Sequence, residues 1–219
     1  MHRVSLAAVA AFFVSASVGA AGTIDFSEFS NGQFIGSASD GSGITATISA
    51  TSDGADHPEL PLAQVFDTSL SPTSDPDLEF PGEDFGNVLI IPENNPLSTV
   101  DRPNDDGAGG TITLMFSETI NFLGFTALDA DSAGQAITAT AAGGFSSGPI
   151  VNGDGLFTVV DGFSVLTDFI TFSFGGSGAI DNIIIREDPP AVIPLPAPAL
   201  MLLSGILGFG VFRRRQKHA

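Results

Sequence analysis

The central part of the chain is a series of short hydrophobic runs separated by Gly, Pro, Asn, Asp and Ser. In 111–116 and 169–174 polar and apolar residues alternate, which is the pattern of a β-strand with one buried face. Turn-forming residues between short runs of this kind are typical of all-β proteins. We therefore predict strands at 23–26, 44–50, 63–68, 87–91, 110–117, 120–128, 136–141, 157–160, 166–174 and 180–186.

The number and length of these runs predict the fold class. No segment within 22–188 has the uninterrupted period of a capped helix. About ten short strands joined by turns favour an antiparallel β-sandwich, most simply a jelly-roll-like one. One stretch, 53–109, is rich in Asp, Pro and Asn and holds only two of the predicted strands. Long irregular segments of compact domains are commonly functional, so we expect a site there.

The N-terminal segment, 1–21, has the parts of a signal peptide. His2 and Arg3 give a short basic start, an apolar run covers 6–14, and small residues follow. This arrangement predicts export, with cleavage after Ala20 or Ala21.

The C-terminal segment differs in composition from the domain. Residues 189–198 form a Pro-rich linker, and 193–212 is an uncharged stretch of the length that spans a hydrocarbon core, about 20 residues. The basic end, 213–219, contains Arg213, Arg214 and Arg215. Basic residues stay in the cytoplasm, so this pattern predicts one transmembrane helix that leaves domain 22–188 outside the inner membrane.

The domain is strongly acidic. All 25 carboxylates lie between Asp25 and Asp188, against two basic residues there, Arg102 and Arg186, which gives a formal charge of −23. Nucleic-acid recognition depends on Lys and Arg, so this composition excludes a nucleic-acid partner. The chain has no Cys, so no disulfide stabilises the exported domain.

The C-terminal tail resembles a known sorting signal. Ile193, Pro194, Leu195, Pro196 and Ala197 precede the apolar stretch and the arginines. Together they are similar to the VPLPA variant of the C-terminal sorting domain in the PEP-CTERM class of exported proteins, with Ile193 where that motif has Val. The resemblance implies recognition and cleavage by an exosortase, a membrane-embedded cysteine peptidase, and delivery to the cell surface or extracellular matrix.

A second resemblance covers the domain. Segments 65–68, 75–78, 86–91, 104–113 and 128–131 follow, in order, the pattern of a recurring domain of exported bacterial proteins that commonly carries such tails. That pattern has a Gln-Glu pair after the 87–91 strand, where this chain has Pro92 and Glu93. The resemblance implies export and does not imply an activity.

Calcium is the cofactor that the acidic residues predict. The ion takes six to eight oxygen ligands, and a cation removes the repulsion between clustered carboxylates. The alternative is that these acids are solvated turn residues, since Asp favours turns for its own backbone reasons. Zinc is not expected, because His57 is the only His or Cys of the domain. The candidate calcium ligands are Asp67, Asp75, Asp77, Glu93, Asp105, Asp106, Asp129 and Asp131.

The residues give little support for catalysis. A Ser-His-Asp triad would need His57, which sits in a loop between Asp56 and Pro58. Carboxylate pairs could hydrolyse a glycoside, yet no Trp or Tyr is present to stack on a sugar. We therefore predict a non-catalytic surface or matrix protein. The alternative is a module that binds carbohydrate such as exopolysaccharide, and an extracellular glycoside hydrolase is the third possibility.

Overall fold

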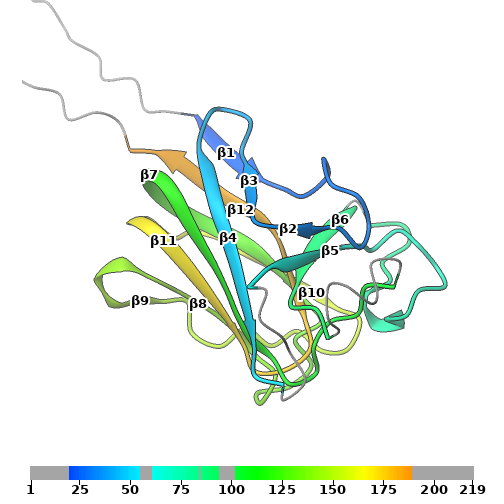
Figure 1. Cartoon of the computed structure of the whole chain (residues 1–219). Coiled ribbons are helices and arrows are strands. Elements are labelled where there is room, and N and C mark those ends of the chain that lie inside the picture. Colours follow the sequence, from blue (N-terminus) through cyan, green and yellow to red (C-terminus); the bar gives the residue numbers. More distant parts are fainter. Residues whose placement is uncertain (1–19, 55–60, 84, 94–101, 189–219) are drawn as a thin grey trace, which may run out of the picture. The chain divides into compact units, whose positions relative to one another are not determined.

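The computed structural model of the chain describes residues 20–54, 61–83, 85–93 and 102–188 (Figure 1). These residues belong to one compact unit, Gly19–Asp188. The predicted sorting motif, transmembrane helix and basic end, and nearly all of the predicted signal peptide, lie outside the described residues. Within the described residues, no helix is long and apolar enough to cross a membrane.

The described part of the chain is all-β, as predicted. It has twelve strands and two short 3-10 helices, η1 (Pro76–Leu78) and η2 (Ala142–Gly144). The strands are β1 (Ala21–Ile24), β2 (Phe34–Ile35), β3 (Ser37–Ser39), β4 (Thr45–Ser52), β5 (Ala63–Asp67), β6 (Asn87–Ile90), β7 (Gly110–Leu128), β8 (Ile137–Ala141), β9 (Phe145–Ser146), β10 (Phe157–Val160), β11 (Val165–Phe174) and β12 (Ala179–Glu187).

Strand β7 is the longest element and organises the sheet. Its first half pairs with β4 and β11, and its second half pairs with β12, β10 and the start of β11, antiparallel in each case. The prediction of two strands here was wrong. Ser117, Glu118 and Thr119 are exposed and interrupt the apolar pattern, although the backbone continues without a turn.

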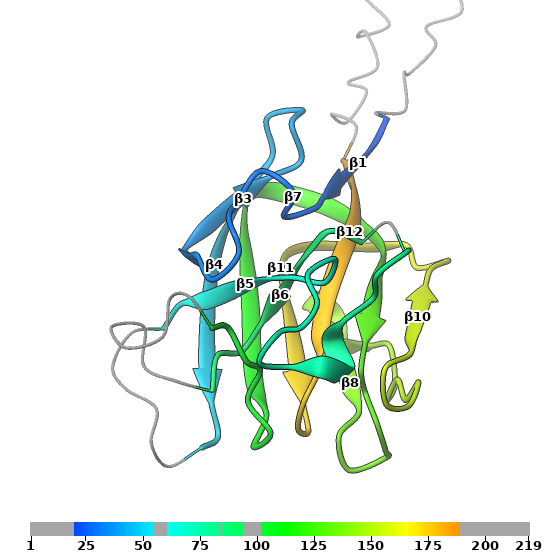
Figure 2. The same cartoon turned by 90° about the vertical axis from the view of Figure 1, so that its right-hand side faces the viewer.

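The sheet curves so that its two ends enclose a common core. The order is β2-β5-β6-β12-β7-β11-β8-β9, and Figure 2 shows β5 crossing in front of β4 and β7. One buried cluster unites side chains from both ends, including Val65 of β5, Ile48 of β4, Leu114 of β7 and Phe172 of β11. Because apolar groups from opposite ends of the sheet are buried against each other, the architecture is consistent with the predicted β-sandwich.

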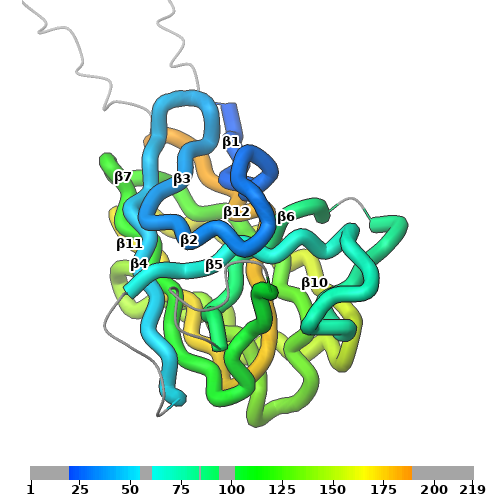
Figure 3. Tube along the Cα trace, turned by 45° about the vertical axis from the view of Figure 1, so that its right-hand side comes forward, coloured from blue at the N-terminus to red at the C-terminus, as the bar shows by residue number. Residues whose placement is uncertain are grey.

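A second, smaller cluster holds the segment between β5 and β6, here called the acidic loop, against the sheet beside β10 (Figure 3). Leu78 of η1 is fully buried with Phe66, Val88 and Leu128. Burying a leucine contributes about 1.5–3 kcal/mol, enough to fix a three-residue helix on the end of β7. The loop is thereby held where the chain leaves β7, and this contact positions the site described next.

Candidate metal centre

Three carboxylates converge at the end of β7. Asp77, Asp129 and Asp154 each offer one oxygen, and these oxygens all lie within 4.8 Å of one another. Calcium–oxygen distances are about 2.3–2.6 Å, so two ligands of one ion lie at most about 4.6–5.2 Å apart. The three oxygens are therefore close enough to share one calcium ion.

Each of the three comes from a different loop. Asp77 is in η1, which Leu78 anchors, and Asp129 follows β7 in the left-handed region with φ 54°. Asp is one of the few residues that adopts this conformation readily. Asp154 belongs to the turn Asn152–Gly155 that precedes β10. The backbone conformation of Asp129 ends the strand and turns the chain toward that loop.

Hydrogen bonds hold the Asp129 and Asp154 loops together. The N–H of Gly155 donates to Oδ1 of Asp129 at 2.8 Å, and the N–H of Asp129 donates to the carbonyl of Leu156 at 2.8 Å. Asn152 adds two bonds, donating from Nδ2 to the Ala127 carbonyl at 2.8 Å and accepting from the N–H of Ala130 at 2.6 Å. The fold itself thus orients two of the three carboxylates.

Two further carboxylates lie behind the first three. Asp75 and Asp105 are buried, and the N–H of Asp105 donates to Oδ2 of Asp75 at 3.2 Å. Asp105 also accepts from the N–H of Gly178, just before β12. The acidic loop, the segment before β7 and the segment before β12 therefore meet at one place.

Ser177 links the two groups of acids. Its hydroxyl lies 2.6 Å from Oδ2 of Asp105 and 3.1 Å from Oδ2 of Asp129. A serine hydroxyl has one proton, so it donates to one of these two oxygens at a time. With both carboxylates ionised, this arrangement leaves an excess of negative charge that a cation or a proton must balance.

Burial changes the acidity of these groups. Burial raises the pKa of Asp129 to about 7, the charges of Asp77 and Asp131 add to the rise, and the Gly155 N–H opposes it. Burial is also the main cause of the raised pKa of Asp75 and of Asp105. Since the neighbouring charges that raise these pKa values belong to other carboxylates, the cluster retains protons at a pH where an ordinary Asp has none.

Asp131 completes the cluster. Its pKa is raised, first by burial and then by the charges of Asp154 and Asp77. Its Oδ1 is buried and has no hydrogen-bond partner among the described residues. A buried carboxylate oxygen without a hydrogen-bond donor is unfavourable by itself and is suited to bind a cation. The residues present therefore fit a hard, oxygen-preferring cation such as calcium.

The other predicted ligands have local partners. Asp67 accepts hydrogen bonds from the N–H and hydroxyl of Ser69, at 2.9 and 2.6 Å, and so closes its own turn. Glu93 accepts from Asn104, and Asp106 accepts from Ser52 and the N–H of Ala108. Asp67 and Glu93 match the alternative of a turn acid in contact with solvent, whereas Asp106 is buried and does not match it. The structure brings together five of the eight predicted ligands, namely Asp75, Asp77, Asp105, Asp129 and Asp131.

Two contributors were not predicted. Asp154 lies far in sequence from the 53–109 stretch, yet Asn152, Gly153, Asp154 and Gly155 have the turn-forming, oxygen-rich composition that could have identified it. Ser177 lies in a glycine run, and a serine in such a run does not by itself indicate a metal site. Both become visible only when the topology places the segments before β10 and β12 beside η1.

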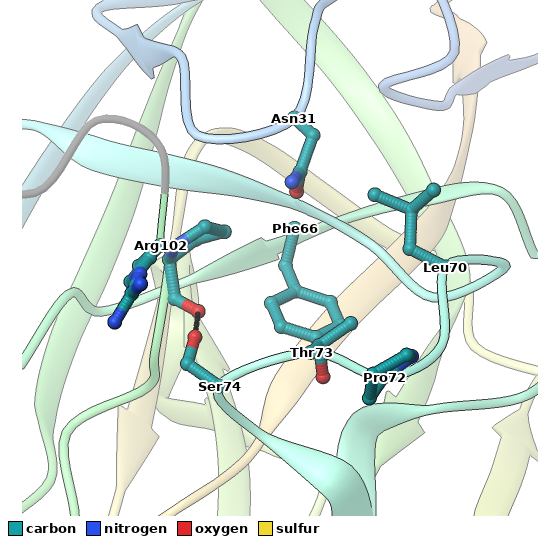
Figure 4. A pocket seen from close by; sticks show the side chains of 8 residues that line it. Asn31, Phe66, Leu70, Pro72, Thr73, Ser74 and Arg102 are labelled. Atoms are coloured by element: carbon teal, nitrogen blue, oxygen red, sulfur yellow. Dashed lines mark hydrogen bonds between the residues drawn. The ribbon is translucent and has the colours of Figure 1, made fainter.

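One pocket of about 380 Å³ lies beside the acidic loop (Figure 4). Its lining includes Phe66, Thr73, Ser74 and Arg102. The Ser74 hydroxyl donates to the Pro103 carbonyl at 2.6 Å, as the dashed line marks, so it is not held by a general base. The hydroxyl of Thr73, another lining residue, lies 2.9 Å from the Glu79 carboxylate and 2.8 Å from the Asp75 carbonyl.

Comparison with protein-family models gives no match, and comparisons with curated proteins and with solved structures give no significant match.

Proposed function

We propose that this chain is a non-catalytic, exported surface or matrix protein whose acidic β-sandwich domain, jelly-roll-like in topology, binds calcium through Asp77, Asp129 and Asp154. The observation that carries the calcium assignment is the convergence of three carboxylate oxygens within 4.8 Å, backed by the buried Oδ1 of Asp131. A cation between carboxylates this close would remove their mutual repulsion.

Calcium has a clear structural role in such a domain. The ion would tie together the acidic loop, the end of β7 and the turn before β10, none of which is joined to another by a disulfide. A ligand that binds only the folded state stabilises it in proportion to the logarithm of its concentration. Extracellular modules bind calcium with dissociation constants of about 10⁻⁴–10⁻³ M, which suits an ion abundant outside the cell.

The route to the surface rests on the two ends of the chain. The basic start and apolar run within 1–21 support export, and the motif Ile193–Ala197 before an apolar stretch and Arg213–Arg215 supports recognition by an exosortase. In this proposal the membrane helix, 193–212, holds the precursor during cleavage, and domain 22–188 is then released to the surface or matrix.

A second candidate function is carbohydrate binding, and one observation favours it. Leu156, Phe157 and Val159 are exposed beside Asp154, and the Phe157 ring packs on Phe85 with centroids 4.6 Å apart. An aromatic ring that is held in place by packing, as Phe157 is by Phe85, can stack on a sugar whose hydroxyls bind a neighbouring calcium ion. Phe157 would take the place of the missing Trp and Tyr.

Thermal unfolding of the full chain tests the calcium assignment. The comparison is millimolar calcium against magnesium at matched ionic strength, because screening alone stabilises so acidic a protein. The Asp77→Asn, Asp129→Asn double variant should lose the calcium-specific increase in Tm, and the exposed Asp168→Asn variant should keep it. Equal Tm in calcium and magnesium for the wild type would refute the assignment.

A glycan array tests the carbohydrate alternative. The wild type should bind a glycan in calcium and not in chelator, and the Phe157→Ala variant should bind it less in calcium.

A further inference from the structure

A second group of acidic residues lies at a break in the sheet, outside the cluster described above. Asp181 is in β12 and is 0 % exposed. Its Oδ2 accepts a hydrogen bond from Nδ2 of Asn182 at 2.8 Å, while its Oδ1 is buried and has no hydrogen-bond partner in the part of the chain that the structure describes. An ionised carboxylate with a bare oxygen in the interior is strongly unfavourable unless something positive reaches it.

Asp181 lies at a discontinuity in the pairing of the sheet. On one edge of β12, Ala179 and Ile180 pair with β6, whereas Ile183 to Arg186 pair with β1. Asp181 and Asn182 lie between these two ladders. On the other edge, the register with β7 shifts between Asp181 and Ile184. Asp181 still pairs with Thr126 of β7, so Asn182 is the residue at which the pairing is interrupted on both edges of the strand.

Asn182 produces this interruption. It is in the left-handed region with φ 47°, a conformation that Asn tolerates better than most residues. A bulge of this kind commonly redirects a side chain at a functional position. Here it leaves Asp181 at an opening in the strand pairing, between the β6 and β1 ladders.

The turn after β1 brings a second carboxylate to the same opening. Ile24 pairs with Ile183, so Asp25, the next residue, follows β1 beside the interruption. The turn is fixed there, because Ser27 donates to Oδ1 of Asp25 and Asn87 donates to the Phe26 and Phe29 carbonyls. Asp25 is exposed, so its carboxylate is open to ions from the solvent on this side.

We propose that Asp181 and Asp25 form a second calcium site, separate from the cluster at Asp77, Asp129 and Asp154. Asp181 supplies its unpartnered Oδ1 from the interior, Asp25 supplies a carboxylate from the turn, and water completes the shell. The ion would bridge the first and last strands of the domain. Burial, the largest cause, and the charge of Asp25 raise the pKa of Asp181 to about 7, so calcium would bind in competition with a proton.

This proposal is independent of the first calcium site, and the experiment separates the two. Equilibrium dialysis of the full chain against millimolar calcium counts the ions bound per chain. The proteins compared are the wild type, the Asp181→Asn and Asp25→Asn single variants, the Asp77→Asn, Asp129→Asn double variant, and that double variant with Asp181→Asn or Asp25→Asn added. The double variant should retain one calcium per chain, and either added substitution should remove it. Asp25 is exposed, so its variant tests the site even where Asp181→Asn disturbs folding.

Two outcomes distinguish the first calcium site from the second. A wild type that binds one calcium, lost in the double variant and unaffected by Asp25→Asn and Asp181→Asn as single substitutions, would overturn the second site and leave the first intact. The wild type could instead bind one calcium that is lost in Asp181→Asn or Asp25→Asn and kept in the double variant. That result would support the second site and refute the first. In chelator, Asp181→Asn should also raise Tm, because it removes a buried charge that has no counter-ion.

Discussion

The N–H of Gly155 donates a hydrogen bond to Oδ1 of Asp129 at 2.8 Å, and this bond joins the end of β7 to the turn that carries Asp154. The two residues are 26 positions apart, and β8 and β9 lie between them in the sequence. The bond orients a fully buried carboxylate toward an exposed one. It also implies that a change at Asp129 affects both the metal ligands and the packing of the turn.

Replacing Asp129 by Asn should therefore have two separable effects. The amide oxygen can still accept from Gly155, so the fold is retained, while the charge that binds calcium is lost. If calcium is present at 100 times its Kd, it stabilises the wild type by about 2.7 kcal/mol, or roughly 5–10 °C in Tm for a domain of this size. Calorimetry should find that increase absent in Asp129→Asn and unchanged in Asp67→Asn, whose carboxylate closes its own turn. Loss of the increase in both variants would contradict the assignment.

The stability of the calcium-free protein should fall as pH rises. Asp129 and Asp181 have pKa values raised to about 7, so between about pH 4 and 7 the folded state binds more protons than the unfolded state. Stability decreases with pH wherever the folded state holds the excess protons. The contribution of these two groups is complete below the unfolded pKa and is lost as pH passes 7.

Melting curves in chelator at pH 5 and pH 8 measure this decrease. Calcium displaces the protons, so it should raise Tm more at pH 8 than at pH 5. Repulsion within a domain of formal charge −23 acts in the same direction. The Asp129→Asn variant isolates the specific part and should give a smaller decrease than the wild type. A variant whose decrease equals that of the wild type would exclude Asp129 as a source of the effect.

Much of the fold could be predicted from the sequence, because strands with one buried face leave an alternating pattern. Strands β10 and β11 were predicted to within one residue at each end. The short strands β2, β3 and β9 were missed, since two or three residues carry no periodicity. The single long β7 was missed because its exposed segment around Glu118 looks like a turn.

The site could be predicted only in part, for a different reason. Asp77 and Asp129 were identified by their acidic neighbours Asp75 and Asp131, a local signal. Asp154 joins them because β10 pairs with the end of β7, which no local pattern specifies. Asp181 was missed because a single Asp inside an apolar strand gives no indication that its oxygen lacks a donor.

Export should remove the signal peptide, and the fold favours one of the two predicted cuts. Ala21 is the first residue of β1 and pairs with Arg186 of β12. Cleavage after Ala20 keeps that pair, whereas cleavage after Ala21 removes it. N-terminal sequencing of the extracytoplasmic protein should therefore begin at Ala21. Retention of Met1 on the exported protein would disprove the signal assignment.

Sorting should depend on the two motif prolines. Replacing Pro194 and Pro196 by Ala should leave uncut precursor in the membrane fraction, because the resemblance assigns recognition to this motif. Replacing Pro189 and Pro190, which lie outside the motif, is the matched control and should leave processing unchanged. Intact mass of protein from whole cells reads both variants. Wild-type processing of the Pro194→Ala, Pro196→Ala variant would mean that the motif is not recognised.

The most direct test of the calcium-binding account is crystallographic. Diffraction from crystals grown with calcium, recorded at a wavelength where calcium scatters anomalously, locates the ion without reference to stability. The account predicts an anomalous peak about 2.3–2.6 Å from carboxylate oxygens of Asp77, Asp129 and Asp154. Well-ordered side chains at these three residues, with no anomalous peak between them at saturating calcium, would contradict it.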